Sequence, residues 1–198
     1  MALKYSHPKY SQFRFDAGTL ALNFVATVRN RGSQPRDLLS TPEAAAKWFR
    51  LAGCSIPVVQ PSAQDLVEAL LLREAIYRAV FAVILSEAPN RDDLDRINFT
   101  ASYSLAAPRI DAQSCGVRWE SPHPARACLA EIARDAVMII GHNGRQRLKM
   151  CDNQSCRMLF VDQSPAKRRR WCAMSLCGNR EKIRTHRRRK RGAEHERI

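Results

Sequence analysis

The chain has 198 residues, of which 45% are hydrophobic, so it is long enough for one well-packed core and a small additional module. Its 33 Lys and Arg outnumber its 19 Asp and Glu and give a formal net charge of +14, which favours an anionic partner such as nucleic acid. No apolar run reaches signal-peptide length near the start, or the roughly 18 residues that suggest a membrane span, so we expect a cytoplasmic protein with reduced thiols and no membrane partner.

The positive charge is concentrated toward the end of the chain. Residues 145–198 hold 17 Lys and Arg against 5 Asp and Glu, whereas residues 1–144 hold 16 against 14. The composition changes at the sequence GHNG, and this change predicts two domains, 1–144 and 145–198.

The first residues predict an arm followed by a helix. Residues 1–15 show no periodicity and indicate an extended segment. Apolar side chains then recur at helical spacing from Leu20 to Val28, and Asp16 or Thr19 offers an N-cap.

Two stronger helices follow. The first has Thr41 as its N-cap and ends at Gly53. The second covers residues 64–86 behind Ser62, and its length predicts the central helix of the core. Its predicted core stripe consists of Leu66, Leu70, Tyr77, Phe81 and Ile84, widened by Val67, Leu71, Val80 and Val83.

The remaining elements of the first domain alternate in type. Asn90 caps a predicted helix over residues 91–103, and residues 105–119 have the turn pattern of a β-hairpin. A last helix follows Pro122 and ends at Gly141. Residues 1–144 are therefore predicted to be mainly α-helical with one β-hairpin.

Four cysteines in the second domain form two pairs, each with four residues between its members: Cys151, Cys156, Cys172 and Cys177. Such paired turns deliver four thiolates to one tetrahedral ion, so we expect structural Zn²⁺, with an iron–sulfur cluster as the alternative. Ordinary buried cysteines or two disulfides fit less well in polar sequence with reduced thiols. Four thiolates also leave no open coordination position for catalysis, and no other enzyme motif is present, so we do not expect an enzyme.

The sequence around these cysteines predicts a small treble-clef-like zinc finger. Two short strands flank the first pair, residues 169–171 suggest a third β segment, and a helix follows Cys177 with Asn179 as its N-cap. The other cysteines, Cys54, Cys115 and Cys128, are expected to be buried or half-buried.

Two basic runs are the candidate nucleic-acid contacts, and they consist of Lys167, Arg168, Arg169 and Arg170, and of Arg180, Lys182, Arg184, Arg187, Arg188, Arg189 and Lys190. Such clusters neutralise phosphates and release counterions, which supplies affinity for nucleic acid. Two alternatives stay open. The final run is also compatible with a solvated, irregular tail, and Arg180 is also compatible with a structural hydrogen bond to a cysteine sulfur.

The segment FVDQSPAKRRRWCAMSLCGNREK resembles the CGNR zinc fingers of bacteria, whose motif stands here as Cys177, Gly178, Asn179 and Arg180. Ala173 departs from the serine expected in that family. DAGTLALNFVATVRNRG and DLLSTPEAAAKWFRLAG resemble the start of the ABATE domain that usually precedes this finger.

The resemblance implies a stress-related transcriptional regulator. Its finger would bind DNA in the cytoplasm, at the nucleoid, and its helical domain would sense a small ligand or form a homodimer. The residues leave two alternatives, an RNA-binding or ribosome-associated protein and an enzyme with a pocket in the helical domain.

Overall fold

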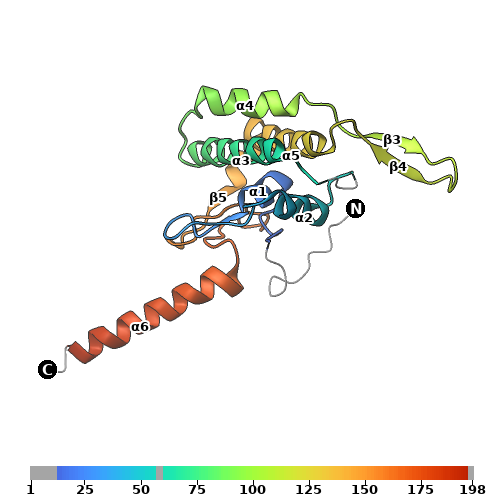
Figure 1. Cartoon of the computed structure of the whole chain (residues 1–198). Helices are drawn as coiled ribbons and strands as arrows, with labels where there is room; N and C mark the ends of the chain where they lie inside the picture. The colour runs from blue at the N-terminus through green and yellow to red at the C-terminus, as the bar shows by residue number, and fades with distance from the viewer. Residues whose placement is uncertain (1–12, 57–59, 196–198) are drawn as a thin grey trace.

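The computed structural model describes residues 13–56 and 60–195, and its helices confirm the mainly α fold class (Figure 1). The helical part contains α1 (Leu20–Val25), α2 (Pro42–Ala52), α3 (Ala63–Ile84), α4 (Arg91–Ala101) and α5 (Pro124–Gly141). It also contains two antiparallel strand pairs. The first is formed by the two-residue strands β1 (Val28–Arg29) and β2 (Arg36–Asp37), and the second is a hairpin of β3 (Ala107–Ile110) and β4 (Val117–Glu120). The first pair was not predicted.

The finger follows a 3₁₀ helix at Asn143–Arg147. It contains β5 (Leu148–Met150), β6 (Leu159–Val161), a π-helical turn at Met174–Gly178 and α6 (Asn179–His195). β5 and β6 pair antiparallel, with Lys149 opposite Phe160.

The helix ends follow the predicted capping chemistry. Thr41 accepts a hydrogen bond from the Ala44 N–H, and Gly53 ends α2 in the left-handed conformation at φ 74°. Ser62 and Asp65 form a capping box at the start of α3. The prediction that the first helix reaches Val28 was wrong, because Val28 enters β1 and pairs with Asp37 instead.

The core lies where α3 packs against α1, α4 and α5 (Figure 1). The predicted stripe of α3 agrees with the observed one only in part. Val80 is fully buried as predicted, but Val67 and Leu71 are exposed, and the fully buried Leu72 and Ile76 were not predicted. The other predicted residues are partly buried against the core: Leu66, Leu70, Tyr77, Phe81, Val83 and Ile84. The buried ridge also carries three alanines, whose small side chains let neighbouring helices approach closely. The sequence pattern predicted burial of the face of α3 with the largest side chains. In the structure the most buried face combines large and small side chains, which pack closely against the neighbouring helices.

The predicted N-terminal arm, residues 1–15, is buried at its end. Residues 1–12 lie outside the described part of the chain, but Phe13 and Arg14 are buried against the rest of the protein. Residues 14–16 form no helix or strand, in agreement with the predicted extended segment, and the burial of Phe13 and Arg14 was not predicted.

The finger and the helical part share one hydrophobic core. Leu159 and Phe160 of β6 are fully buried in the same cluster as Phe24 and Trp48. Backbone contacts join the two parts as well, because the Val161 N–H donates to the Ala17 carbonyl over 2.8 Å. A division at residue 144 into independently folding domains stays a prediction.

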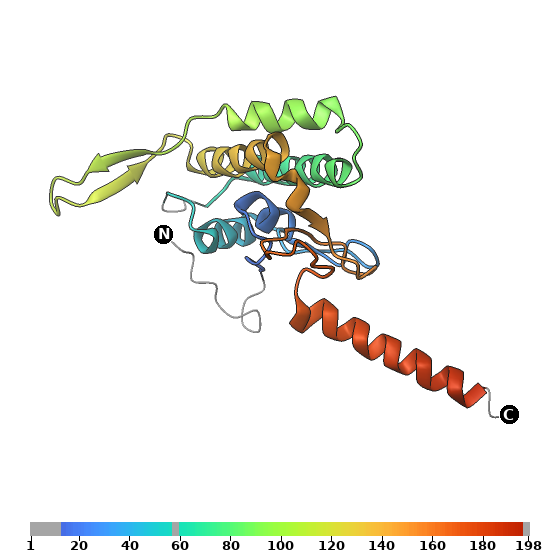
Figure 2. The same cartoon turned by 180° about the vertical axis from the view of Figure 1, so that it is seen from behind.

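Two elements leave the body of the molecule at opposite ends. The β3–β4 hairpin extends beyond the ends of α4 and α5, and α6 extends from the finger on the other side, in both views (Figures 1 and 2). No helix in the described ranges is both long and apolar enough to cross a bilayer.

Candidate metal centre and nucleic-acid interface

Four cysteine side chains converge at the junction of the finger and the helical part. Their Sγ atoms all lie within 4.8 Å of one another, with 3.8 Å from Cys156 to Cys172 and 3.7 Å from Cys172 to Cys177. A regular tetrahedron of sulfurs around zinc, with Zn–S bonds of about 2.3 Å, has S···S edges of about 3.8 Å. Disulfide bonds are excluded here, since all four thiols are free and a disulfide needs an S–S distance of about 2.05 Å.

The first cysteine pair is held by a turn between β5 and β6. The Cys151 N–H donates to the Met158 carbonyl over 2.9 Å, and the Cys156 N–H donates to the Asn153 carbonyl over 2.8 Å. The Asn153 side chain accepts from the N–H groups of Ser155 and Cys156. An Asx turn inside a short hairpin thus places both sulfurs on the same side.

The second pair is held by the π-helical turn. The N–H groups of Cys177 and Gly178 both donate to the Ala173 carbonyl. The helix therefore begins before the last ligand candidate, and the prediction of Asn179 as an N-cap was wrong: Asn179 is already helical, and its side chain donates to the Ser175 carbonyl over 3.4 Å. The predicted third β segment is also absent from the described residues. In its place the Asp152 N–H donates a backbone hydrogen bond to the Arg170 carbonyl.

Arg14 is the residue of the metal centre that the sequence analysis missed. It is only 5% exposed, its Nη1 donates to Cys172 Sγ over 3.2 Å, and it forms an ion pair with Asp16. The pKa of Cys172 is held well below its ordinary value by hydrogen bonds from the other three cysteines. The positive charge of Arg14 lowers it further. The alternating pattern of Phe13 to Asp16 was the only available signal. Arg180, which the sequence offered as the sulfur contact, is exposed instead.

The donor set suits one structural Zn²⁺. Four thiolates around Zn²⁺ leave two excess negative charges in a largely buried site, and the Arg14 guanidinium offsets part of that charge. His142 is the exposed C-cap of α5 and His186 lies on exposed α6, so four sulfurs complete the candidate ligand set among the described residues.

Asp162 organises the loop that carries the first basic run. It is fully buried, and its carboxylate accepts hydrogen bonds from the Ser164 hydroxyl at 2.6 Å, the Ser164 N–H at 3.0 Å and the Arg169 N–H at 2.8 Å. Burial raises the pKa of Asp162, but these hydrogen bonds outweigh it and hold the pKa below its ordinary value. The loop between the cysteine pairs is therefore folded around an ionised carboxylate.

Within this loop the four cations have different environments. Lys167 and Arg168 are exposed. Arg170 is exposed and paired with Asp152 at 2.7 Å. Arg169 is half-buried, donates to the Cys172 carbonyl over 2.6 Å and lies over the Phe160 ring at 4.9 Å. These contacts give Arg169 a structural role in the loop, in place of the solvent-facing position that the sequence suggested.

Residues 18–143 match the family described as "ABATE: Putative stress-induced transcription regulator". The chain belongs to the ABATE family. Residues 147–190 match the CGNR zinc finger, so both resemblances found in the sequence are confirmed, and Arg14 lies ahead of both matched ranges. No curated protein sequence matched the chain.

The second basic run of this ABATE protein lies on α6. Arg180, Lys182 and Arg187 are exposed, and Arg184 is exposed and paired with Glu181 at 2.9 Å. The backbone of Arg188, Arg189 and Lys190 continues the helix, and their side chains lie outside the described part of the chain. The alternative of an irregular tail is wrong for the backbone as far as His195.

A hollow of about 370 Å³ separates the basic loop of the ABATE protein from α6, and it is lined by Arg170, Trp171, Glu181, Lys182, Thr185 and His186. Trp171 is half-buried, and its indole N–H is buried without a hydrogen-bond partner among the described residues. Cations from both basic runs thus border one concave surface, which the sequence separation of the runs did not reveal.

The other cysteines of the ABATE protein do not belong to the candidate ligand group. Cys128 is buried and Cys54 half-buried, as predicted, and a hydrogen bond to Cys128 together with burial raises the pKa of Cys54. Cys115 is exposed in the turn of the β3–β4 hairpin at φ 52°, so the prediction that it is buried was wrong.

Proposed function

We propose that this protein is a zinc-dependent, DNA-binding transcriptional regulator. Zn²⁺ would be held by the four thiolates of Cys151, Cys156, Cys172 and Cys177, and its chemistry would be structural. The observation that carries the proposal is the hollow where cations of the loop and of α6 meet, next to the cysteine cluster that fixes both elements.

The proposed contacts to DNA are the exposed cations of both runs. Lys167 and Arg168 on the loop, and Arg180, Lys182 and Arg187 on α6, face solvent and are available to phosphates. Arg170 and Arg184 can contact phosphates as well, at the expense of their ion pairs with Asp152 and Glu181. Arg169 would act indirectly, by holding the loop in shape. Arg188, Arg189 and Lys190 extend the same helix and belong to the proposed surface.

The helical part would provide the regulatory half of the protein, by binding a ligand or by dimerisation, with the finger (residues 145–198) following residues 1–144. Its family is described as regulatory, and its interior is filled by large side chains such as Trp48, Phe24 and Leu72. A filled interior gives less support to the alternative of an enzyme with a buried pocket in this domain, and its two largest described hollows lie at the root of the exposed β3–β4 hairpin. Binding to DNA would locate the protein at the nucleoid in the cytoplasm.

A salt titration of binding to random duplex DNA and duplex RNA tests the proposal, using zinc-loaded protein with and without chelator. We expect DNA binding that weakens steeply with salt and is lost with the metal. Tighter binding to RNA at equal salt would favour the RNA-binding alternative, and binding that survives metal removal unchanged would contradict the role of the finger.

Single variants localise the contact surface. Lys182→Gln should weaken binding and lower the salt slope by about one, the amount expected for one phosphate contact. Arg91→Gln removes an exposed cation from α4, outside the proposed surface, and should leave the slope unchanged. Equal effects of the two variants would show that only net charge matters.

A further inference from the structure

The β3–β4 hairpin has one polar and one apolar face. Its register places Pro108 opposite Trp119 and Ile110 opposite Val117. Opposed residues of an antiparallel pair lie on the same face, so these four side chains share a face. The other face carries Ala107, Arg109, Arg118 and Glu120.

Nothing among the described residues covers the apolar face at its outer end. Ile110 is 80% exposed, Val117 71% and Trp119 40%, and both strands are exposed along their whole length. A two-stranded hairpin in water is marginally stable at best by itself, and a projecting apolar face of this kind is typical of an interaction site.

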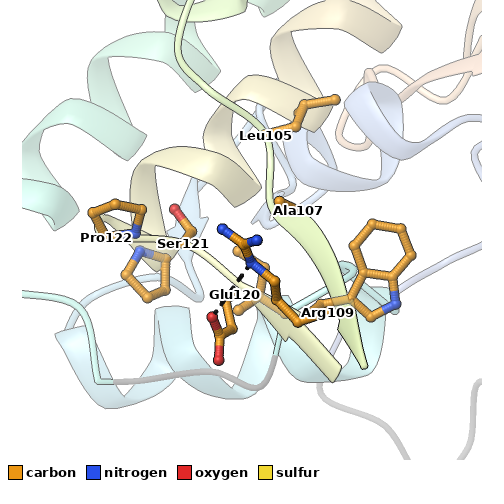
Figure 3. Close-up of a pocket in the computed structure, with 9 residues that line it drawn as sticks. Leu105, Ala107, Arg109, Glu120, Ser121 and Pro122 are labelled. Atoms are coloured by element: carbon orange, nitrogen blue, oxygen red, sulfur yellow. Dashed lines mark ion pairs between the residues drawn. The ribbon is translucent and has the colours of Figure 1, made fainter. Parts of the chain in front are cut away.

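Two hollows flank the root of the hairpin. The hollow in Figure 3, of about 560 Å³, contains the Arg109–Glu120 ion pair, and it is also lined by Ile56, Leu105, Ala107, Trp119 and Pro122. The second, of about 610 Å³, is lined by Cys54, Ile56, Val117 and Trp119 together with Arg50, Ser55 and Arg118. Because Trp119 and Ile56 line both hollows and Val117 lines the second, the apolar face continues into the root of the hairpin as far as Ile56.

The charges of the hairpin favour a second copy of this chain as the occupant. Arg109 and Arg118 are matched by Asp111 and Glu120, and Arg118 pairs with both acidic side chains. The hairpin is thus neutral in a chain of formal charge +14, and it leaves the body at the end opposite to α6 (Figures 1 and 2). Two copies can meet through their hairpins without bringing their most basic elements together.

We propose that the β3–β4 hairpin is a homodimerisation arm. The apolar faces of two arms pack together about a two-fold axis, with the arms running in opposite directions. Ile110 and Val117 of each arm then lie over Trp119 and the root hollow of the other, so both apolar faces are covered by one symmetric contact.

Sedimentation equilibrium of the zinc-loaded full chain over a wide concentration range tests the proposal, at salt sufficient to screen the net charge. We expect the wild type to be a dimer that dissociates on dilution. The double variant Ile110→Lys, Val117→Lys adds two charges to the apolar face of each arm, and its dissociation constant should rise at least about a hundredfold. Wild type that is monomeric at every concentration, or a double variant that still dimerises, would overturn the proposal.

Phe99→Lys is the matched control, because Phe99 is an apolar side chain that is 65% exposed on α4, outside the strands of the hairpin. It should dimerise like the wild type, and an equal loss of dimer in this variant would contradict a specific role of the hairpin. Amide hydrogen exchange in the wild type gives a second readout that needs no variant. Protection of β3 and β4 should increase with protein concentration, and protection that is independent of concentration would count against the arm.

Discussion

At the residue scale, two buried ionic side chains define the finger more than its exposed cations do. Asp162 fixes the basic loop through three hydrogen bonds, and Arg14 reaches the cysteine cluster from 158 residues away in the chain. Both are charges removed from water, and such charges are tolerated only when they are paired or hydrogen-bonded. The charges of Arg14 and Asp162 therefore have structural roles in the finger.

Arg14→Met tests the role of the guanidinium at the metal centre. The variant keeps most of the side-chain volume but loses the hydrogen bond to Cys172 Sγ and the compensating charge. Outer partners of metal ligands typically contribute about 10–100-fold to metal affinity, so we expect zinc transfer to a chromogenic chelator to be faster by at least about tenfold.

Arg14→Lys is the control for this variant, since it restores the positive charge without the planar donor. It should lie between Arg14→Met and the wild type. Identical zinc release in all three proteins would show that Arg14 serves only the packing of the segment that contains Phe13.

At the element scale, the loop between β1 and β2 contacts the first cysteine turn and helps to hold it against the helical part. The Gly32 N–H donates to the Ser155 carbonyl over 3.3 Å. A Cβ atom at Gly32 would lie 1.7 Å from the Gln154 carbonyl oxygen, a backbone atom that cannot turn aside as a side chain could. Glycine is required here by close approach of two backbones.

Gly32→Ala should therefore separate the loop from the cysteine turn. We expect the free energy of unfolding to fall by about 1–3 kcal/mol, the usual cost of overfilling a packed site, together with faster zinc release. Gly141→Ala is the matched control, because a Cβ atom there meets nothing within 4 Å, and it should be neutral or slightly stabilising. Denaturant titration of both variants measures the difference, and equal stabilities would contradict the close contact.

At the scale of the whole molecule, one core extends through both matched families. Leu148, Leu159 and Phe160 of the finger belong to the same buried cluster as the aromatic residues of α1 and α2. The finger has too few large apolar side chains for a core of its own, and packing on the helical part supplies the remainder. The metal thus stabilises the finger, and the finger in turn covers part of the core of the helical part.

Removal of zinc should accordingly weaken more than the finger. In Cys177→Ser, we expect loss of metal, unfolding of the finger and lower amide protection in α1, which would lose its packing against β6. Sequence alone predicts the simpler result of an intact helical domain beside an unfolded finger. Hydrogen exchange of the variant and the wild type distinguishes the two, and unchanged protection in α1 would show that the domains fold independently.

The sequence determined much of what depends on neighbours along the chain. Three features that the structure confirms are local signals: the capping residues Thr41 and Ser62, the turn of the β3–β4 hairpin, and the spacing of the four cysteines. The CGNR motif likewise identified its family from contiguous residues. Local backbone geometry is sufficient for these features, because their hydrogen bonds join residues a few positions apart.

The tertiary structure decided whatever depends on residues far apart. It brought Arg14 to Cys172, turned Arg169 from a surface cation into a loop contact, and selected the Leu72 ridge of α3 as the buried one. It also left the apolar face of the β3–β4 hairpin exposed, although antiparallel strands commonly pack one face on a core. The physical reason is that burial is a property of the assembled fold: a side chain is desolvated by whichever element packs over it, and no local pattern specifies that element.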